Sequence, residues 1–500
     1  MGFGHRAHQN DPIRPFHALI AVLIVAVGAW LRGRGAGGDL WLDEIWSLNL
    51  ATAMSAWHEA LWKVIHDNNH PLNTIFLYLA GPDREPWVYR LSAIVAGTLS
   101  IVAVGWVMMR DGAGRMLSAM LLVAVLYPLV HFGSEARGYA LMILFAYIAF
   151  GAVDQARDNP HRVRWLFGGA VMLGAASHLS ILPIALMMAA AYGLREWGAG
   201  RTLWQAIKIT FWFSAPAAGG LALVGGGIVY GLNQPADMGW YGGGATTCPE
   251  VGCFIAAWDQ IVHFSTGGFG EGLAGLHAGL FAILMAGTVL GLLVVRQGRG
   301  YLYAAILIGA PLTYLALGQP SSPYGRYFIG VFAFAPLVVS DVVGELRTRS
   351  IVGRVLAGGA LLALISANAW AATQFHKIGR GHYTKAFETI SESTPGDTLS
   401  IGSDMTFRFS TVFDHVAKRA GTDKAIRYVE PGDVSRARPD WLVIVLKTES
   451  TLLDAICLGG GDSTNAPVVY RLGGVFTAWG LSGETWGVYH RLSARPPRCP

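Results

Sequence analysis

Residues 16–44 read FHALIAVLIVAVGAWLRGRGAGGDLWLDE, an apolar run that leads through a glycine-rich stretch into an acidic pair. The run from about Phe16 to Leu31 approaches the roughly 20 residues that cross a bilayer. A cleaved signal peptide is the alternative, but the stretch after the run is a poor cleavage region and further apolar runs follow. We therefore predict an uncleaved first membrane span with the basic N-terminus in the cytoplasm.

Apolar runs of similar length recur along most of the chain. Of its 500 residues, 53% are hydrophobic and 14% are charged, against about 25% charged in soluble proteins. This composition excludes a disordered chain, a coiled coil and an ordinary soluble enzyme. The net charge of +5 does not indicate nucleic-acid binding, because the basic residues stand singly between apolar runs. Together with the first span, about 11 spans are predicted, the others near 91–109, 116–132, 138–153, 165–178, 181–194, 209–230, 276–295, 301–318, 327–343 and 352–373.

The placement of lysine and arginine predicts the orientation of these spans. With the N-terminus inside, most basic residues fall in cytoplasmic loops, Arg115 and Arg299 among them. The outer loops hold few, which makes Arg90, Arg137 and Arg326 charges that the topology does not need.

Residues 374–500 form a second predicted domain, after a membrane domain at residues 1–373. An odd number of spans places this tail outside the cytoplasm, and no run of span length remains in it. Strand-like runs alternate there with a helical pattern near 405–420, which predicts a small α/β domain. The runs are WLVIVL at 441–446, PVVYRL at 467–472 and WGVYHRL at 486–492.

All four cysteines fall on the outer side of this topology. Cys248 and Cys253 share one outer loop, and Cys457 and Cys499 lie in the tail. Disulfides persist outside the cytoplasm, so we predict the pairs Cys248–Cys253 and Cys457–Cys499. A metal knuckle is the alternative for the first pair, although no second pair lies near it.

The first outer loop, at about residues 32–90, is too long for a simple connection. Asp43 and Glu44 follow the first span directly. Pro71 is expected to begin an interfacial helix, because its missing N–H costs nothing in a first turn, and His70 would cap it. The alternatives are a solvated acidic pair and a helix-capping or packed imidazole. One amphipathic surface helix is predicted from apolar residues at helical spacing, Trp46, Leu50, Met54, Trp57 and Leu61.

Further polar residues mark the outer ends of later spans. Glu135 and Arg137 lie between two spans with almost no loop, where a local ion pair or a site for a lipid phosphate are the two interpretations. His178 ends a span, as a functional or a structural histidine. Arg326 and Tyr327 fit either a binding role or interfacial anchoring.

These polar residues were singled out after the topology, yet all fall on the outer side. Together they supply carboxylates, imidazoles and guanidiniums. A reaction on a membrane-borne phosphate ester requires a carboxylate that takes a proton and cations that offset the charge of the leaving phosphate.

At these positions the sequence resembles the GT-C superfamily of polyprenyl-phosphate-sugar-dependent glycosyltransferases. The closer likeness is to the branch with protein O-mannosyltransferases, lipid A aminoarabinose transferases and RgtA/B/C-like enzymes. The resemblance covers about residues 15–345 and rests on five motifs in order. They are the acidic pair Asp43–Glu44, His70–Pro71–Leu72 for H-P-P-L-Y, Arg90–Leu91–Ser92–Ala93 with Gly97, Ser134 to Leu141 for S-x-E-A-R-x-Y-A-L, and Arg326–Tyr327–Phe328.

This resemblance implies an α-helical polytopic membrane protein of GT-C type with a small C-terminal extracytoplasmic domain. It implies a polyprenyl-phosphate-linked sugar donor, an extracytoplasmic acceptor and inversion at the sugar, in a bacterial inner membrane. Asp43 and Glu44 would be catalytic, and His70, Arg137 and Arg326 would bind the donor phosphate. The substrate pocket would be completed by Glu135, Tyr139, His178 and Tyr327.

The sequence differs from the family pattern at two positions, and two other functions are alternatives to this interpretation. Leu72 and Asn73 stand where the family has proline and an aromatic residue, so acceptor recognition near them is expected to differ. No cofactor is required by the sequence, although a divalent cation is left open. A transporter or flippase for lipid-linked sugars is the alternative function, and a non-catalytic assembly subunit is the third.

Overall fold

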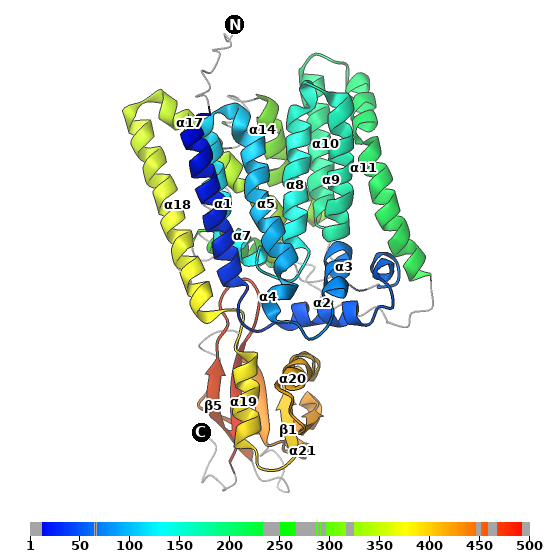
Figure 1. Cartoon of the computed structure of the whole chain (residues 1–500), viewed down its shortest axis with the longest axis vertical. Coiled ribbons are helices and arrows are strands. Elements are labelled where there is room, and N and C mark those ends of the chain that lie inside the picture. Colours follow the sequence, from blue (N-terminus) through cyan, green and yellow to red (C-terminus); the bar gives the residue numbers. More distant parts are fainter. Residues whose placement is uncertain are drawn as a thin grey trace. The chain divides into compact units, whose positions relative to one another are not determined.

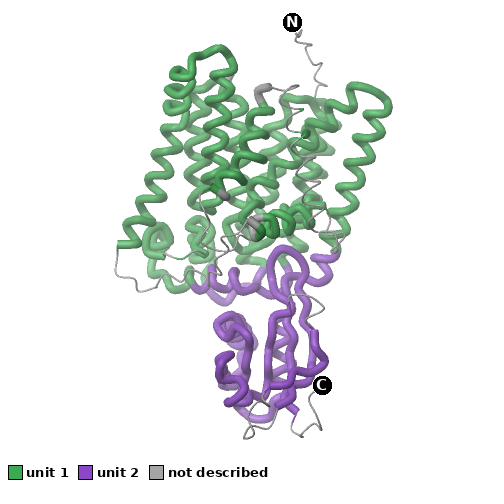
Figure 2. The backbone as a smooth tube through the Cα atoms, turned by 180° about the vertical axis from the view of Figure 1, so that it is seen from behind, with its two compact units in different colours: residues 1–36, 50–81, 87–373 green, residues 37–49, 82–86, 374–500 purple. Residues whose placement is uncertain are grey.

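The computed structural model describes residues 13–64, 66, 68–233, 251–266, 287, 288, 291, 297–316, 325–446, 452–458 and 468–492. The chain divides into two compact units, which Figure 2 colours separately. The first comprises residues 1–36, 50–81 and 87–373, and the second comprises residues 37–49, 82–86 and 374–500. The second unit therefore joins two segments of the predicted first outer loop to the C-terminal part of the chain.

The described secondary-structure elements of the first unit are all helical. Its first half contains α1 (Pro15–Gly35), η1 (Trp57–Leu61), α3 (Pro71–Ala80), α4 (Pro86–Tyr89), α5 (Leu91–Met108), η2 (Met109–Asp111), α6 (Ala113–Val125), α7 (Tyr127–Phe132), α8 (Tyr139–Asp154) and η3 (Gln155–Arg157). Its second half contains α9 (Pro160–Ser177), α10 (Ile181–Gly198), α11 (Leu203–Leu232), α12 (Val251–Ser265), α14 (Gln297–Ala304), the π-helical turn η5 (Ala305–Gly309), α15 (Ala310–Ala316), η6 (Gly325–Phe328), α16 (Ile329–Phe332), α17 (Ala335–Arg349) and α18 (Ile351–Ile378).

Local sequence explains where several of these helices begin. Proline occupies the first turn of α1, α3, α9 and α17, where its missing N–H costs no hydrogen bond. Thr202 and Gln205 form a capping box at the start of α11, the longest described helix of the unit. Pro216 lies inside α11 without ending it, as helices packed in a membrane bundle allow.

Helices occupy the predicted spans wherever the structure describes them. The span predicted near 276–295 lies almost entirely outside the described residues, and α12 was not predicted. Among the described residues, five helical runs are long and apolar enough to cross a membrane, and shorter apolar helices include α6 and α8. The predicted count of about 11 spans is not confirmed.

The long helices of this unit run side by side, as Figure 1 shows for α1, α5, α8 and α9. α5 packs against α1, α6 and α8, and α9 packs against α8 and α11. The sequence places the connections between α5 and α6, and between α8 and α9, on the predicted cytoplasmic side.

Arg32 is a buried residue of α1 and not the beginning of a loop, because the helix continues to Gly35. Its side chain is 1% exposed, and its guanidinium donates hydrogen bonds to the carbonyl oxygens of Gly28, Val123 and Ala124. A Cβ on Gly97 would lie 2.6 Å from Arg32 Nε. Gly97, which belongs to the motif that begins at Arg90, therefore leaves space for the Arg32 side chain.

The prediction of a single amphipathic helix in the first outer loop is wrong. Its residues form two elements, α2 (Leu42–Thr52) and η1, with a break between them. The break is stabilised by Glu59, whose carboxylate accepts a hydrogen bond from the Ser55 backbone N–H at 3.0 Å. Met54 packs with Ala60 and Val64 in a small core of its own, so helical spacing arose here from two short elements.

Buried ion pairs connect the predicted cytoplasmic ends of several helices. Arg299 of α14 pairs with Asp111, with Asp154 of α8 and with Asp341 of α17. Arg115 of α6 also pairs with Asp341. These arginines were predicted to be loop charges, whereas both are largely buried, and paired carboxylates offset their desolvation.

The C-terminal part of the second unit is an α/β domain. It contains α19 (Tyr383–Ser393), β1 (Thr398–Ser403), α20 (Thr406–Ala420), β2 (Ala425–Val429), η7 (Pro431–Asp433), α21 (Val434–Ala437), β3 (Trp441–Leu446), β4 (Ala455–Leu458), β5 (Val468–Phe476) and β6 (Thr485–Arg491). The six strands form one sheet in the order β2-β1-β3-β6-β5-β4. β1 pairs in parallel with β2 and β3, and the remaining pairs are antiparallel.

This domain confirms the three strands and the helix expected in the tail, while α19, β1, β2 and β4 were not predicted.

Tyr470 and Tyr489 belong to one buried core cluster of the sheet. Trp486 is also buried, and its ring contacts Phe409 and Phe413 of α20 and Tyr383 of α19. These aromatic contacts fix both helices on the sheet.

Candidate functional site

His70 lies at the start of α3, as the sequence predicts. It is the N-cap residue, with Pro71 at the first position of the helix, but its side chain makes no capping hydrogen bond. The side chain is only 3% exposed. Helix capping by the imidazole therefore does not explain its position, and its neighbours come next.

The rings of His70, His178 and Tyr139, from separate parts of the first unit, lie together. The imidazoles of His70 and His178 are stacked, with ring centroids 4.8 Å apart and planes 23° apart. The Tyr139 ring lies 4.4 Å from that of His178 and 5.8 Å from that of His70. The cap of α3, the end of α9 and the start of α8 therefore converge on one point.

Gly138 permits this convergence. A Cβ at this position would lie 1.9 Å from the Ser177 carbonyl oxygen and 2.9 Å from the His70 Cβ. The first of these contacts is with backbone, which cannot move aside as a flexible side chain can. The glycine of the S-x-E-A-R-x-Y segment is therefore required for the close approach of α9.

Arg137 stands beside the three rings. Its guanidinium carbon lies 5.0 Å from the centroid of the Tyr139 ring. It donates a hydrogen bond of 2.6 Å to the Asn68 side-chain oxygen, and it lies 3.9 Å from the Glu135 carboxylate. Glu135 is fully buried, with His131 Nε2 at 3.5 Å. The predicted local ion pair exists, but at a long distance and within a larger polar cluster.

Arg326 and Tyr327 of η6 lie near the His178 ring. The Tyr327 ring lies 6.5 Å from that of His178, and the Arg326 guanidinium carbon lies 5.8 Å from the Tyr327 ring centroid. The predicted residues of the first unit thus come together. We define the His–Arg cluster as His70, Arg137, Tyr139, His178, Arg326 and Tyr327.

Buried polar atoms of this cluster have unused hydrogen-bonding capacity. His70 Nε2 and the Tyr139 hydroxyl are buried and make no hydrogen bond within the described part of the chain. Burial, and then the electrostatic effects of His178, Arg137 and Arg326, lower the pKa of His70 well below its ordinary value. A neutral imidazole beside two guanidiniums creates a site that favours an anion carrying hydrogen-bonding groups.

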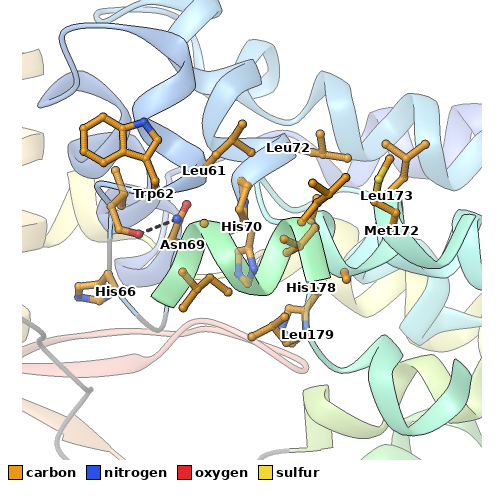
Figure 3. A pocket seen from close by; sticks show the side chains of 18 residues that line it. Leu61, Trp62, His66, Asn69, His70, Leu72, Met172, Leu173, His178 and Leu179 are labelled. Atoms are coloured by element: carbon orange, nitrogen blue, oxygen red, sulfur yellow. Dashed lines mark hydrogen bonds between the residues drawn. The ribbon is translucent and has the colours of Figure 1, made fainter. Parts of the chain in front are cut away.

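A cavity of about 400 Å³ adjoins the two stacked histidines (Figure 3). Residues of α9 and α11 form one part of its wall, and residues after η1 and at the start of α3 form another. The lining is apolar except for His66, Asn69, His70 and His178. An apolar cavity that ends at buried imidazoles suits an amphiphile with a polar head.

Leu72 and Asn73 occupy the positions where the sequence departs from the family pattern. Leu72 lines the cavity. Asn73 is fully buried, donates to the Ala136 carbonyl oxygen and accepts a hydrogen bond from the Ser92 hydroxyl. The Asn73 amide thus crosslinks three segments of the first unit. The expected difference in acceptor recognition stays a prediction.

Asp43 and Glu44 belong to the second unit, in the first turn of α2. Glu44 is fully buried, and its carboxylate accepts a hydrogen bond of 3.3 Å from the Trp41 backbone N–H. It therefore supplies half of a capping box for its own helix. Asp43 is also buried, at 7% exposure.

Sequence reasoning missed Asn68 and His131 of the first unit, and it missed the burial of Arg90. Asn68 precedes His70 in HDNNHP and binds Arg137 directly. His131 stands four residues before Glu135, which is helical spacing for a contacting pair. Arg90, predicted to be a surplus outer charge, is fully buried and donates to the Ala36 carbonyl oxygen. The spacing to Glu135 could have indicated His131, whereas the contacts of Asn68 and Arg90 are long-range.

The structure also bears on metals and disulfides. Within the described ranges, no group of three or more His, Cys, Asp or Glu side chains is arranged to hold a metal ion. Cys457 of β4 is disulfide-bonded. Cys248, Cys499 and the side chain of Cys253 lie outside the described residues, so the predicted pairing stays a prediction.

Comparisons with known proteins give the fold class. No protein-family model matches the chain, and no curated protein matches it. Among solved structures, the apo oligosaccharyltransferase of Archaeoglobus fulgidus matches with a TM-score of 0.51 at 12% identity, over 86% of this chain and 70% of that one. ArnT from Cupriavidus metallidurans bound to undecaprenyl phosphate matches with a TM-score of 0.48 at 11% identity, over 95% and 97%.

These findings define a multi-pass membrane protein with the GT-C fold and a small C-terminal sheet domain. The fold expected from the five motifs is thereby confirmed, apart from the number of spans. The fold assignment rests on the match to the Archaeoglobus fulgidus oligosaccharyltransferase.

Proposed function

We propose that the chain is a membrane glycosyltransferase that moves a sugar from a polyprenyl-phosphate donor to an extracytoplasmic acceptor. The acceptor is a glycolipid, a polysaccharide or a protein, and the reaction inverts the anomeric centre. The N-terminus faces the cytoplasm of a bacterial cell and residues 374–500 face the opposite side of the inner membrane. A solved structure with the same fold is an oligosaccharyltransferase, which supports this class of reaction.

The observation that carries the proposal is the cavity beside the His–Arg cluster. Its wall is apolar, and His70 and His178 lie at one place in that wall. A polyprenyl-phosphate sugar combines a long apolar chain with a charged phosphate. The apolar wall accommodates part of the chain, and the cationic groups next to the histidines bind the phosphate.

Arginine suits the role of phosphate ligand for a geometric reason. Its guanidinium presents donors in a planar fork that matches two phosphate oxygens, whereas lysine offers a point charge. Arg137 is buried and Arg326 is partly buried. A phosphate bound beside them gives both guanidiniums a charge-assisted hydrogen-bond partner.

Asp43 acts as the base in this proposal. Its carboxylate takes the proton from the acceptor hydroxyl or amine as that atom bonds to the anomeric carbon of the sugar. The bond between this carbon and the phosphate oxygen breaks, and its electron pair leaves with the polyprenyl phosphate. Arg137 and Arg326 stabilise the charge that the phosphate gains. Glu44 holds the first turn of α2, which carries Asp43, through the Trp41 N–H.

The test uses the purified full chain, a synthetic short-chain polyprenyl-phosphate sugar and an extract of candidate acceptors. Mass spectrometry follows both the released polyprenyl phosphate and the acceptor that gains the sugar mass. The proposal predicts that both appear together and only with the chain present. Movement of an intact donor across a reconstituted bilayer, with no phosphate released, would instead establish the flippase alternative.

A further inference from the structure

The segment that carries the acidic pair is held by the C-terminal domain. Residues 37–49, which we call the acidic segment, belong to the same compact unit as residues 374–500 (Figure 2). More than 320 residues of sequence separate them. Contacts between described residues connect them on each side of Asp43.

The first contact joins Asp39 to the start of α19. The Asp39 carboxylate accepts a hydrogen bond of 2.8 Å from the Thr384 backbone N–H and one of 2.7 Å from the Thr384 hydroxyl. The residue at the N-cap of α19, His382, makes no capping hydrogen bond with its side chain. Asp39 thus supplies the cap from a distant segment, with its charge at the favourable end of the helix.

The second contact joins Trp46 to the start of α20. Its ring lies 4.8 Å from the Phe407 ring at an interplanar angle of 41°. Phe407 stays 52% exposed with this contact in place. Asp39 lies four residues before Asp43 and Trp46 three residues after it, and the two contacts therefore restrain the acidic segment on both sides.

We propose that Asp39, Thr384 and Phe407 are positioning residues that hold Asp43 in its reactive orientation through the C-terminal domain. The inference rests on the proposed function, because it assigns Asp43 the role of base. A base must lie within hydrogen-bond reach of the proton that it takes, and small misplacements lower turnover steeply. Because these residues do not touch substrate, their loss lowers kcat and leaves the donor KM unchanged.

The chain offers matched variants for the first contact. Thr384→Val removes one hydrogen bond, Asp39→Ala removes both, and Thr384→Ser keeps the hydroxyl. Thr389→Val is the control, because Thr389 lies on the same helix and its hydroxyl donates only within α19, to the Lys385 carbonyl oxygen. We expect kcat to fall by roughly tenfold in Thr384→Val and further in Asp39→Ala, with wild-type values in Thr384→Ser and Thr389→Val.

The second contact is tested by Phe407→Ala with Leu453→Ala as its control. Leu453 is a similarly exposed apolar residue of the same unit, at 54%. Phe407→Ala is expected to lower kcat by roughly tenfold, while Leu453→Ala leaves it unchanged. In an Asp43→Asn background, Thr384→Val should cause no further loss, because no base remains to be positioned.

Hydrogen exchange separates the failure of this inference from the failure of the proposed function. In the full chain, the amides of residues 39–48 should exchange faster in Asp39→Ala than in the wild type and in Thr389→Val, whatever reaction the protein catalyses. Unchanged exchange would overturn the restraint itself. Faster exchange with wild-type kcat, in a chain that does transfer sugar, would show a structural contact and overturn the positioning role. A wild-type chain without transferase activity would overturn the proposed function and leave the exchange result to decide the restraint.

Discussion

The imidazoles of His70 and His178 stack 4.8 Å apart, although they belong to the cap of one helix and the end of another. Burial, and then His178, Arg137 and Arg326, disfavour a charge on His70. Both imidazoles of this pair also line the apolar cavity. The pair is therefore the structural centre of the proposed donor site.

Acidification tests the environment of His70. Its folded-state pKa is lowered from the ordinary value of 6.5, so the unfolded chain binds the proton more readily. Stability should be complete above that value and should fall as the pH drops below it. Melting curves in detergent should show a smaller acid-induced loss of Tm for His70→Gln than for the wild type. An equal loss in both proteins would show that His70 does not contribute.

Substitution of the arginines tests the phosphate site. Arg326→Lys and Arg137→Lys keep the charge but lose the planar fork, so the donor KM should rise by roughly tenfold, about 1.4 kcal/mol. Arg349→Lys is the control, because Arg349 is exposed at the end of α17. Steady-state kinetics with a short-chain donor gives both constants. If neither cluster variant alters donor affinity or turnover, the phosphate binds elsewhere.

Gly138→Ala tests the close approach of α8 and α9. The new Cβ would lie 1.9 Å from the Ser177 carbonyl oxygen, and we expect a loss of about 1–3 kcal/mol together with impaired donor binding. Gly169→Ala provides the comparison, since nothing lies within 4 Å of its Cβ and alanine favours a helix. Thermal unfolding and donor titration measure the two effects. A Gly138→Ala protein as stable as wild type would contradict this packing.

The cysteine pairing remains to be measured. We expect disulfides Cys248–Cys253 and Cys457–Cys499, the second of which closes a loop of about 40 residues and should add a few kcal/mol to the tail domain. Non-reducing peptide mass spectrometry of protein from an oxidising compartment identifies the linked peptides. Four free thiols, or a Cys457 linked to a different cysteine, would refute the pairing.

The sequence predicted the parts of the fold that depend on local pattern. Apolar runs located most helices, and Pro71 located the start of α3, because these signals lie within one element. The five motifs identified most of the His–Arg cluster. The break between α2 and η1 was missed because Met54 keeps helical spacing while belonging to a separate small core.

Other features could not be predicted because they depend on distant parts of the chain. Arg32 resembled a loop charge, and its burial depends on carbonyl oxygens of α6 and on the space left by Gly97. Asp39 lies in the predicted first outer loop, and its partner Thr384 is more than 300 residues away in the sequence. Neither relationship leaves a periodic or compositional signal.

Turnover of Asp43→Asn tests the proposed function most directly. Asparagine keeps the size of the side chain but cannot take the proton, so product formation should fall by at least about 10²-fold while donor affinity is retained. Asp83→Asn serves as the control, because Asp83 is an exposed acid of the same loop whose carboxylate pairs only weakly with Lys418 at the surface. Purified Asp43→Asn that binds donor but transfers almost no sugar is the predicted result. Near-normal transfer by the folded variant would contradict the assignment of Asp43 as the base.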